Sequence, residues 1–125
     1  MAVVYSTALK NIRMDAVDTE INGGTGAGKL EIGTAAMASI LATIDLADPS
    51  APAASGGVLT FTMPQSDTSA DNTGTAAEAR IRDGDDVDII TGLTVGTGGQ
   101  DIVLNSTSIT ITQQVTMNTA AITHG

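Results

Sequence analysis

The sequence predicts an all-β fold: an antiparallel β-sandwich or jelly-roll-like domain of about seven or eight short strands with one N-terminal α-helix. Three observations lead to this expectation. Apolar and polar residues alternate in many short segments, and a period of two places successive side chains on opposite faces of a sheet. The segments are rich in β-branched Ile, Val and Thr, which suit a pleated surface. Turn-forming residues separate them at intervals of roughly 8–12 residues.

The 125 residues are expected to form a single domain, 1–125, with one modest core. Within it, residues 1–22 make an N-terminal arm and helix, and residues 47–57, rich in Pro, Ala, Gly and Ser, make an extended connector. The only aromatic residues are Tyr5 and Phe61, so the core is aliphatic and thin for the length of the chain. A thin core indicates that copies of the chain or another protein complete its stability.

Near the N-terminus, four apolar residues recur at helical spacing: Tyr5, Leu9, Ile12 and Ala16. They predict a helix over Ser6–Ile21 whose apolar side lies on the sheet. Ser6 or Thr7 suits the start of this helix, and Gly23 suits its end. Its polar side is expected to consist of Lys10, Asn11, Asp15 and Asp18.

Alternation then predicts a series of strands in the middle of the chain. The expected strands are Lys29–Thr34, Ser39–Ala47, Leu59–Met63 and Glu78–Arg82. Asp48-Pro49 and Pro64 close the second and third of these strands. The polar stretch Gln65–Gly74 is expected to be a loop.

The remainder of the chain continues the pattern. Asp83–Asp85 is a hairpin turn signal, and Val87–Val95 resumes as a strand that Gly92 interrupts. Gly96–Gly99 turns the chain into its last third, Asp101–Thr123, around which we expect the sheet to be organised. There, Ser108–Thr112 and Val115–Asn118 alternate on either side of Gln113-Gln114, which predicts paired, half-buried strands.

Charge and composition exclude several classes of function. The chain has 5 basic and 14 acidic residues and a formal net charge of −9, which leaves too few cations to bind nucleic acid or an anionic membrane. It has no cysteine, so disulfides and thiolate sites are excluded. No stretch approaches the roughly 20 apolar residues of a membrane span, and no secretory h-region is evident. We expect a soluble protein made in the cytoplasm.

Three motifs have some features of ligand sites. Gly23–Gly28 with Lys29 has the spacing of a phosphate-binding loop. However, Leu30 stands where a hydroxyl residue should follow, and the expected next element is a strand instead of a helix, so we expect a flexible turn. The acidic cluster Asp83–Asp88 is either a calcium site or a solvated hairpin, and the EF-hand pattern fails. Gly98–Asp101 matches part of a calcium-binding repeat only once, so a turn is preferred.

Catalytic residues are not predicted. Glu20, Glu31, Glu78 and the aspartates could supply a carboxylate pair for glycoside hydrolysis, but their spacing singles out no two of them. The only histidine, His124, is penultimate and therefore a poor general base or metal ligand. We expect no enzyme activity, and no catalytic, cofactor-binding or metal residue is assigned.

Several segments together resemble small structural proteins of tailed bacteriophages. The similar pieces are YSTALKNIRMDAV, LATIDLADPSAPAASGGVLTF, TGTAAEARIRDGD and VGTGGQDIVLNSTSITITQQVTM, with Leu104–Ile109 the most characteristic. Related proteins often have an aromatic pair where this chain has Ala77–Arg80.

The resemblance implies a non-enzymatic virion protein, first of all a capsid cement or decoration protein on the capsid exterior. It implies that the major capsid protein or another virion protein is the partner, and that the chain forms a homo-oligomer. Two alternatives remain open: a neck, tail or fibre-associated protein, and a free carbohydrate- or host-binding β-sandwich. The arm Ala2–Tyr5 is a candidate for strand pairing with the capsid.

Overall fold

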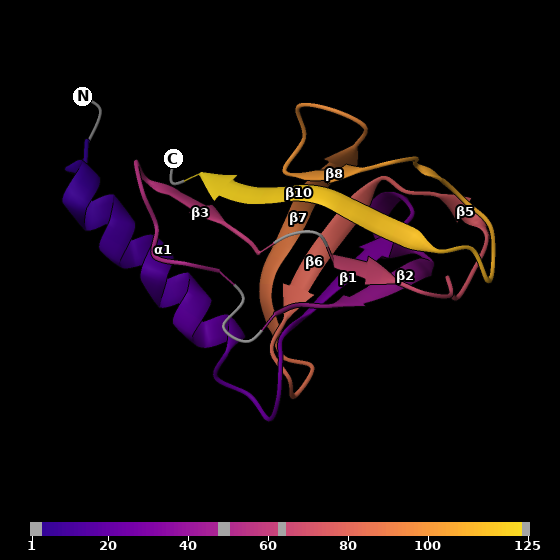
Figure 1. Ribbon diagram of the computed structural model, residues 1–125, viewed down its shortest axis with the longest axis horizontal. Coiled ribbons are helices and arrows are strands. Elements are labelled where there is room, and N and C mark those ends of the chain that lie inside the picture. The colour runs from indigo at the N-terminus through magenta and orange to yellow at the C-terminus, as the bar shows by residue number, and fades with distance from the viewer. Residues whose placement is uncertain (1–3, 48–50, 63–64, 124–125) are drawn as a thin grey trace.

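The computed structural model describes residues 4–47, 51–62 and 65–123, which form a curled sheet with one α-helix, α1 (Thr7–Ile21), at one end (Figure 1). The strands are β1 (Lys29–Gly33), β2 (Ile40–Asp45), β3 (Val58–Thr60), β4 (Gln65–Asp67), β5 (Gly74–Thr75), β6 (Glu78–Arg82), β7 (Asp88–Gly96), β8 (Ile102–Leu104), β9 (Ser108–Ile109) and β10 (Val115–Thr123). A short 3-10 turn, Ala35–Met37, joins β1 to β2.

Eight of these strands form one sheet in the order β2-β1-β6-β7-β8-β10-β3, and β4 pairs with β10 beside this path. The pair β7–β8 is parallel, and the other pairs are antiparallel. The mainly β character and the N-terminal helix are therefore confirmed. The expectation of a purely antiparallel all-β domain is wrong, because the sheet is mixed and a helix contributes to the core.

The sheet curls until its β2 edge meets the segment after β4. The carboxylate of Asp67 accepts a hydrogen bond from the Thr43 amide at 3.0 Å, and the Asp71 amide donates to the Leu41 carbonyl at 2.7 Å. The curl encloses one core, in which alternate residues of facing strands meet. Its largest fully buried side chains are Phe61, Ile21, Leu30, Ile32, Leu41, Ile44, Leu59, Ile81, Ile102, Leu104, Ile109 and Met117.

The last third of the chain is central to the sheet, as expected, because β10 pairs with β3, β4 and β8. The expected pairing of Ser108–Thr112 with Val115–Asn118 is wrong. β9 covers only Ser108–Ile109 and pairs with β5. Thr112 has a φ of +73° and its amide donates to the Ala70 carbonyl at 2.8 Å, so the chain leaves the extended conformation before it can form that hairpin.

Helix α1 lies where the sequence predicts it and begins at Ser6, whose side chain accepts a hydrogen bond from the Leu9 amide at 3.2 Å. The prediction of its buried side is wrong. Ile12 is 65% exposed and Leu9 is 40% exposed, whereas Met14 and Ile21 are buried and Val17 packs against the core.

The polar side of α1 holds the helix in this orientation. The Asn11 side-chain oxygen accepts a hydrogen bond from the Gly57 amide at 2.9 Å, and an Asp15 oxygen accepts one from the Ala54 amide at 2.7 Å. These two bonds satisfy backbone groups of the connector, so the polar side faces the molecule.

The connector is folded, which corrects the expectation of an extended 47–57 segment. Ser55 and Val58 exchange two backbone hydrogen bonds of 3.0 Å around Gly56 and Gly57, and both glycines have positive φ. Residues 48–50 lie outside the described residues, as do residues 63–64 at the end of the predicted third strand. Within the expected loop Gln65–Gly74, β4 forms an edge strand.

The predicted interruption of β7 at Gly92 is confirmed as a β-bulge. Ala79 pairs with Leu93, and Ile81 pairs with Ile90, so two residues of β7 lie opposite the one residue between them on β6. Gly92 has a φ of +74°, a conformation that L side chains rarely adopt.

Candidate functional site

The first feature is a charge network on the outer face of β1, β6 and β7. Glu31 Oε1 accepts a hydrogen bond from the Nε atom of Arg80 at 2.7 Å and forms a salt bridge with the Nε atom of Arg82 at 3.2 Å. Arg82 also contacts Asp88 at 2.6 Å. Burial of Arg82 lowers its pKa, but the hydrogen bond to Asp88 and the nearby carboxylates outweigh this effect, and the net shift is upward. The network links three strands through charged pairs.

The glycine-rich loop and the acidic turn form a second feature, because they pack against each other. A Cβ on Gly24 would lie 2.7 Å from the Gly84 nitrogen. The Thr25 amide donates to Asp85 at 3.2 Å, and Lys29 Nζ lies 3.2 Å from Asp86. The expectation of a turn at Gly23–Gly28 is confirmed, and its lysine pairs with a carboxylate of the acidic turn.

The carboxylates of the acidic turn are all held by protein donors. Asp83 Oδ1 accepts the amides of Asp85 at 2.9 Å and Val87 at 3.0 Å, while Asp85, Asp86 and Asp88 bind different segments. In the part of the chain that the structure describes, no group of three or more His, Cys, Asp or Glu side chains could hold a metal ion. Calcium binding at Asp83–Asp88 stays a hypothesis, which calorimetric titration with calcium would test.

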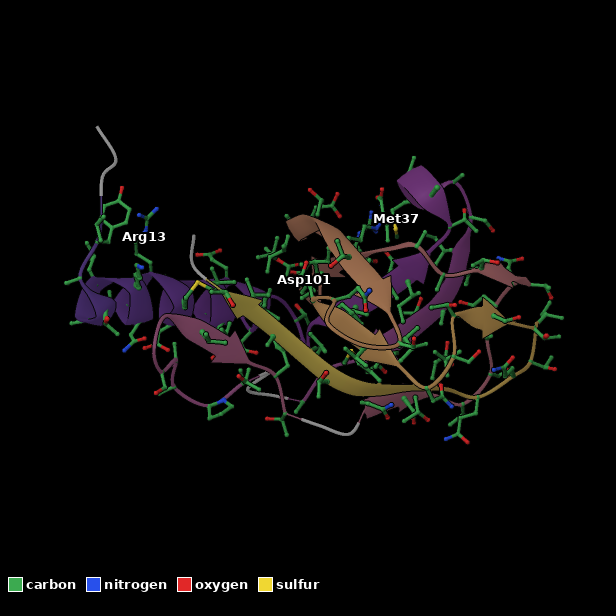
Figure 2. The ribbon with its side chains drawn as sticks, turned by 90° about the horizontal axis from the view of Figure 1, so that it is seen from above. Arg13, Met37 and Asp101 are labelled. Carbon is green, nitrogen blue, oxygen red and sulfur yellow. The ribbon has the colours of Figure 1, made fainter. Side chains whose placement is uncertain are left out.

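The other candidates from the sequence are placed as follows. Glu31 contacts two arginines in the middle of the β1–β6 strand pair, while Glu78 lies at one end of this pair, opposite Gly33. His124 lies outside the described residues. The Gly98–Asp101 turn is confirmed: Asp101, labelled in Figure 2, accepts the amide and hydroxyl of Thr94, each at 3.1 Å.

Exposed apolar side chains lie at the two ends of the molecule and, in the case of Val87, in the acidic turn. At one end lie the exposed apolar residues that we call the helix stripe: Leu9, Ile12 and Ala16 of α1, and Tyr5, which precedes the helix. Arg13 flanks the stripe, with its guanidinium carbon 4.8 Å from the centre of the Tyr5 ring, and points away from the sheet (Figure 2). Val4, which precedes the helix, is also exposed.

At the opposite end, near β5 in Figure 1, Ile111 is 51% exposed. We call Thr110–Gln113 the Ile111 tip. The Ile111 amide donates to the Thr73 hydroxyl at 2.9 Å, and the Thr110 amide donates to the Gln113 side chain at 2.9 Å. Ala70 and Gln113 are joined by a backbone hydrogen bond of 2.8 Å. The tip is therefore a fixed loop that presents one apolar side chain outward.

The sequence does not predict that either end of the molecule is an exposed apolar surface. It placed the helix stripe against the sheet and Ile111 in a half-buried strand. For the helix, a signal of the correct orientation was present: Asn11 and Asp15 lie one turn apart, and their side chains accept hydrogen bonds from amides of the connector. For the Ile111 tip, no local sequence pattern distinguishes Thr112, which has a positive φ, from a residue in a strand.

No pocket is detected among the described residues, and none of the described helices has the length and apolar character to cross a membrane. Comparison with protein-family models, curated proteins and solved structures finds no match to this chain.

Proposed function

We propose that the chain is a non-enzymatic structural protein of a tailed-bacteriophage virion, and that it decorates the capsid exterior by binding where major capsid proteins meet. The observation that carries the proposal is the pair of exposed apolar ends on a small acidic body. Exposed apolar groups rimmed by polar residues are typical of protein-binding surfaces. The same function is what the resemblance inferred from Leu104–Ile109 and its flanking segments implies.

We infer that the Ile111 tip makes the contact with the capsid. Its backbone is held by hydrogen bonds with Ala70 and Thr73, so little conformational entropy is lost when Ile111 enters a pocket. A protein that binds only the assembled lattice stabilises it by mass action. Several copies around a symmetry axis would add avidity.

We also infer that the curled sheet is an open variant of the sandwich or jelly-roll architecture. Supporting this, the β2 edge and β4 approach each other through Thr43 and Asp67, and the two flanks of the sheet share one core. Sandwich and jelly-roll architectures are common in virion proteins, which is why this inference supports the proposal.

Quantitative mass spectrometry of purified particles tests the proposal. Copy numbers on the order of hundreds per particle, scaled to the major capsid protein, would support decoration. About a dozen copies would indicate the neck or tail instead. Absence from the particles would overturn the virion function and favour a free binding module, which a glycan array would test.

A binding assay tests the contact. Particles prepared without the protein are incubated with wild type, Ile111→Ser or Val87→Ser. Val87 is a matched control because it is 55% exposed and belongs to the acidic turn. We expect Ile111→Ser to weaken binding by about tenfold and Val87→Ser to leave it unchanged. Equal binding by all three proteins would show that the tip does not contact the capsid.

A further inference from the structure

Helix α1 is followed by a dipeptide, Asn22-Gly23, whose side chain and backbone can react with each other. The backbone nitrogen of the residue after an asparagine can attack the side-chain amide carbon and close a succinimide ring. Glycine in that position favours the reaction, because it has no Cβ to hinder ring closure and its backbone rotates most freely. Asn22 is the one asparagine that precedes glycine; the others are Asn11, Asn72, Asn105 and Asn118. Asn22 is therefore the asparagine most susceptible to deamidation.

The reaction needs no reagent besides water. The Gly23 nitrogen bonds to Cγ of Asn22, its proton goes to the side-chain nitrogen, and that nitrogen leaves as ammonia. Water then opens the ring at one of its two carbonyl carbons. Opening at Cγ leaves an aspartate in a normal chain, whereas opening at the backbone carbon leaves an isoaspartate, whose main chain runs through Cβ and Cγ. Both products carry a carboxylate, and the isoaspartate also adds a methylene to the main chain.

In the folded chain, the conformation of Asn22 prevents ring closure. Asn22 ends the helix with a φ of −83° and a ψ of −3°, and ψ must rotate far from this value before the Gly23 nitrogen lies beside Cγ. The Asn22 amide donates to the Asp18 carbonyl at 3.0 Å, and the Gly23 amide donates to the Glu20 carbonyl at 3.2 Å. A proton held in a hydrogen bond is harder to remove, so the bond of the Gly23 amide also disfavours the attack.

Tertiary contacts on both sides of the dipeptide hold this conformation. Ile21, directly before it, is fully buried, and a Cβ on Gly28 would clash with its side chain. Gly24, directly after it, packs against the backbone of Gly84 in the acidic turn, and Figure 1 shows this turn beside the loop that follows α1. We call the contact of Gly24 with Gly84 the glycine junction. The reaction requires a local opening that releases these contacts.

We propose that Asn22 is a deamidation site that the glycine junction keeps unreacted, and that it reacts when the junction opens. The isoaspartate product then prevents the junction from closing. It lengthens the backbone directly before Gly24, where even a Cβ would lie 2.7 Å from the Gly84 nitrogen. Its carboxylate adds a negative charge at the C-terminal end of the helix, where the macrodipole disfavours anions. Chains that stay open are thereby removed from the folded population. The proposal does not depend on the virion function, because it follows from this junction alone.

Peptide mass spectrometry tests the site. Trypsin releases the peptide Met14–Lys29, in which Asn22 is the only amide side chain. The full chain is incubated in mildly alkaline buffer with and without an unfolding concentration of urea. We expect this peptide to deamidate at least about tenfold faster in urea than in buffer, and faster in urea than the peptides that contain the other asparagines. Equal rates in urea and buffer would overturn protection by the fold. A rate in urea no higher than that of the other asparagines would overturn the site.

Two substitutions of similar expected cost to stability test the junction. Asp85→Ala removes the hydrogen bond that the Thr25 amide donates at 3.2 Å, and should raise the deamidation rate in buffer at least about twofold. Ile109→Val trims a buried side chain of β9, far from the junction, and should leave the rate unchanged. Circular dichroism establishes that both variants are folded. Equal increases in both would mean that Asn22 reacts only through global unfolding, and the junction would not control the reaction.

Urea denaturation of the separated products tests the consequence. The isoaspartate chain should unfold at a lower urea midpoint than the Asn22→Asp variant, which adds the same charge without the extra methylene. Equal midpoints would overturn the proposal that the modified backbone prevents the junction from closing.

Discussion

At the scale of single residues, one close contact in the molecule is made by backbone rather than by side chains. Gly24 and Gly84 belong to two turns far apart in the sequence, and their backbones touch. Neither glycine has a positive φ, so the close approach is what requires glycine here. The contact fixes the acidic turn against the loop that follows α1.

Replacing Gly84 with alanine should therefore destabilise the fold. Its Cβ would meet the carbonyl group of Thr25, which is backbone and cannot move aside as a side chain can. We expect a loss of about 2 kcal/mol or more in the free energy of unfolding, measured by urea denaturation. Gly98→Ala is the control, since its Cβ would enter open space, and it should change stability by less than about 0.5 kcal/mol.

The charge network predicts a contrast between two carboxylates. Glu31 is 15% exposed and serves two arginines, whereas Asp86 is 59% exposed and pairs with Lys29. We expect Glu31→Gln to cost about 1–3 kcal/mol, because it leaves Arg80 and Arg82 without their shared anion. Asp86→Asn should cost less than about 0.5 kcal/mol. Equal costs in urea denaturation would contradict this account of the network.

At the scale of elements, the orientation of α1 is set by its second half and by the connector. Met14, Val17 and Ile21 enter the core, and Asn11 and Asp15 bind amides of the connector. The first half of the helix consequently extends beyond the sheet.

Two truncations distinguish the two apolar faces of the helix. Met14→Ala leaves a cavity in the core and should lower the free energy of unfolding by about 2–4 kcal/mol. Ile12→Ala removes a side chain that is 65% exposed and should change it by less than about 0.5 kcal/mol in the monomer. Thermal unfolding at low protein concentration measures both. The opposite ranking would mean that the sequence-based orientation of the helix is correct.

The sequence predicts the positions of the helix and strands well, but it predicts poorly which strands pair and which side of the helix is buried. The alternation of Leu30 and Ile32, and of Ala79 and Ile81, is enough to identify β1 and β6, because a half-buried strand needs no further information. The buried side of α1 could not be chosen in the same way, since both sides are apolar. The parallel β7–β8 pair and the Ile111 tip depend on contacts between distant segments, which periodicity does not encode.

At the scale of the whole molecule, the sheet is one continuous structure that depends on its last strand. β10 joins β3, β4 and β8, and its Val115, Met117 and Ala120 are buried. Removing β10 would separate these strands and open the core, so we expect the sheet to unfold in a single step.

Native-state hydrogen exchange tests this expectation. Amides paired within β1, β6 and β10 should share one free energy of opening, equal to that of global unfolding. Amides in the first half of α1 should open at lower free energy, because this half is largely exposed. The experiment requires a concentration at which the chain is monomeric. A lower opening energy for β10 than for β1 and β6 would contradict the single cooperative sheet.

The pairing of β3 with β10 also has a consequence for synthesis on the ribosome. Val58 pairs with Thr123, so β3 must wait until β10 has been made before it gains its partner. The hairpin of β1 and β2, whose strands are neighbours in sequence, can form much earlier. Until β10 emerges, the nascent chain exposes the apolar inner surface of an incomplete sheet, and a premature stop codon within β10 should yield an aggregating product.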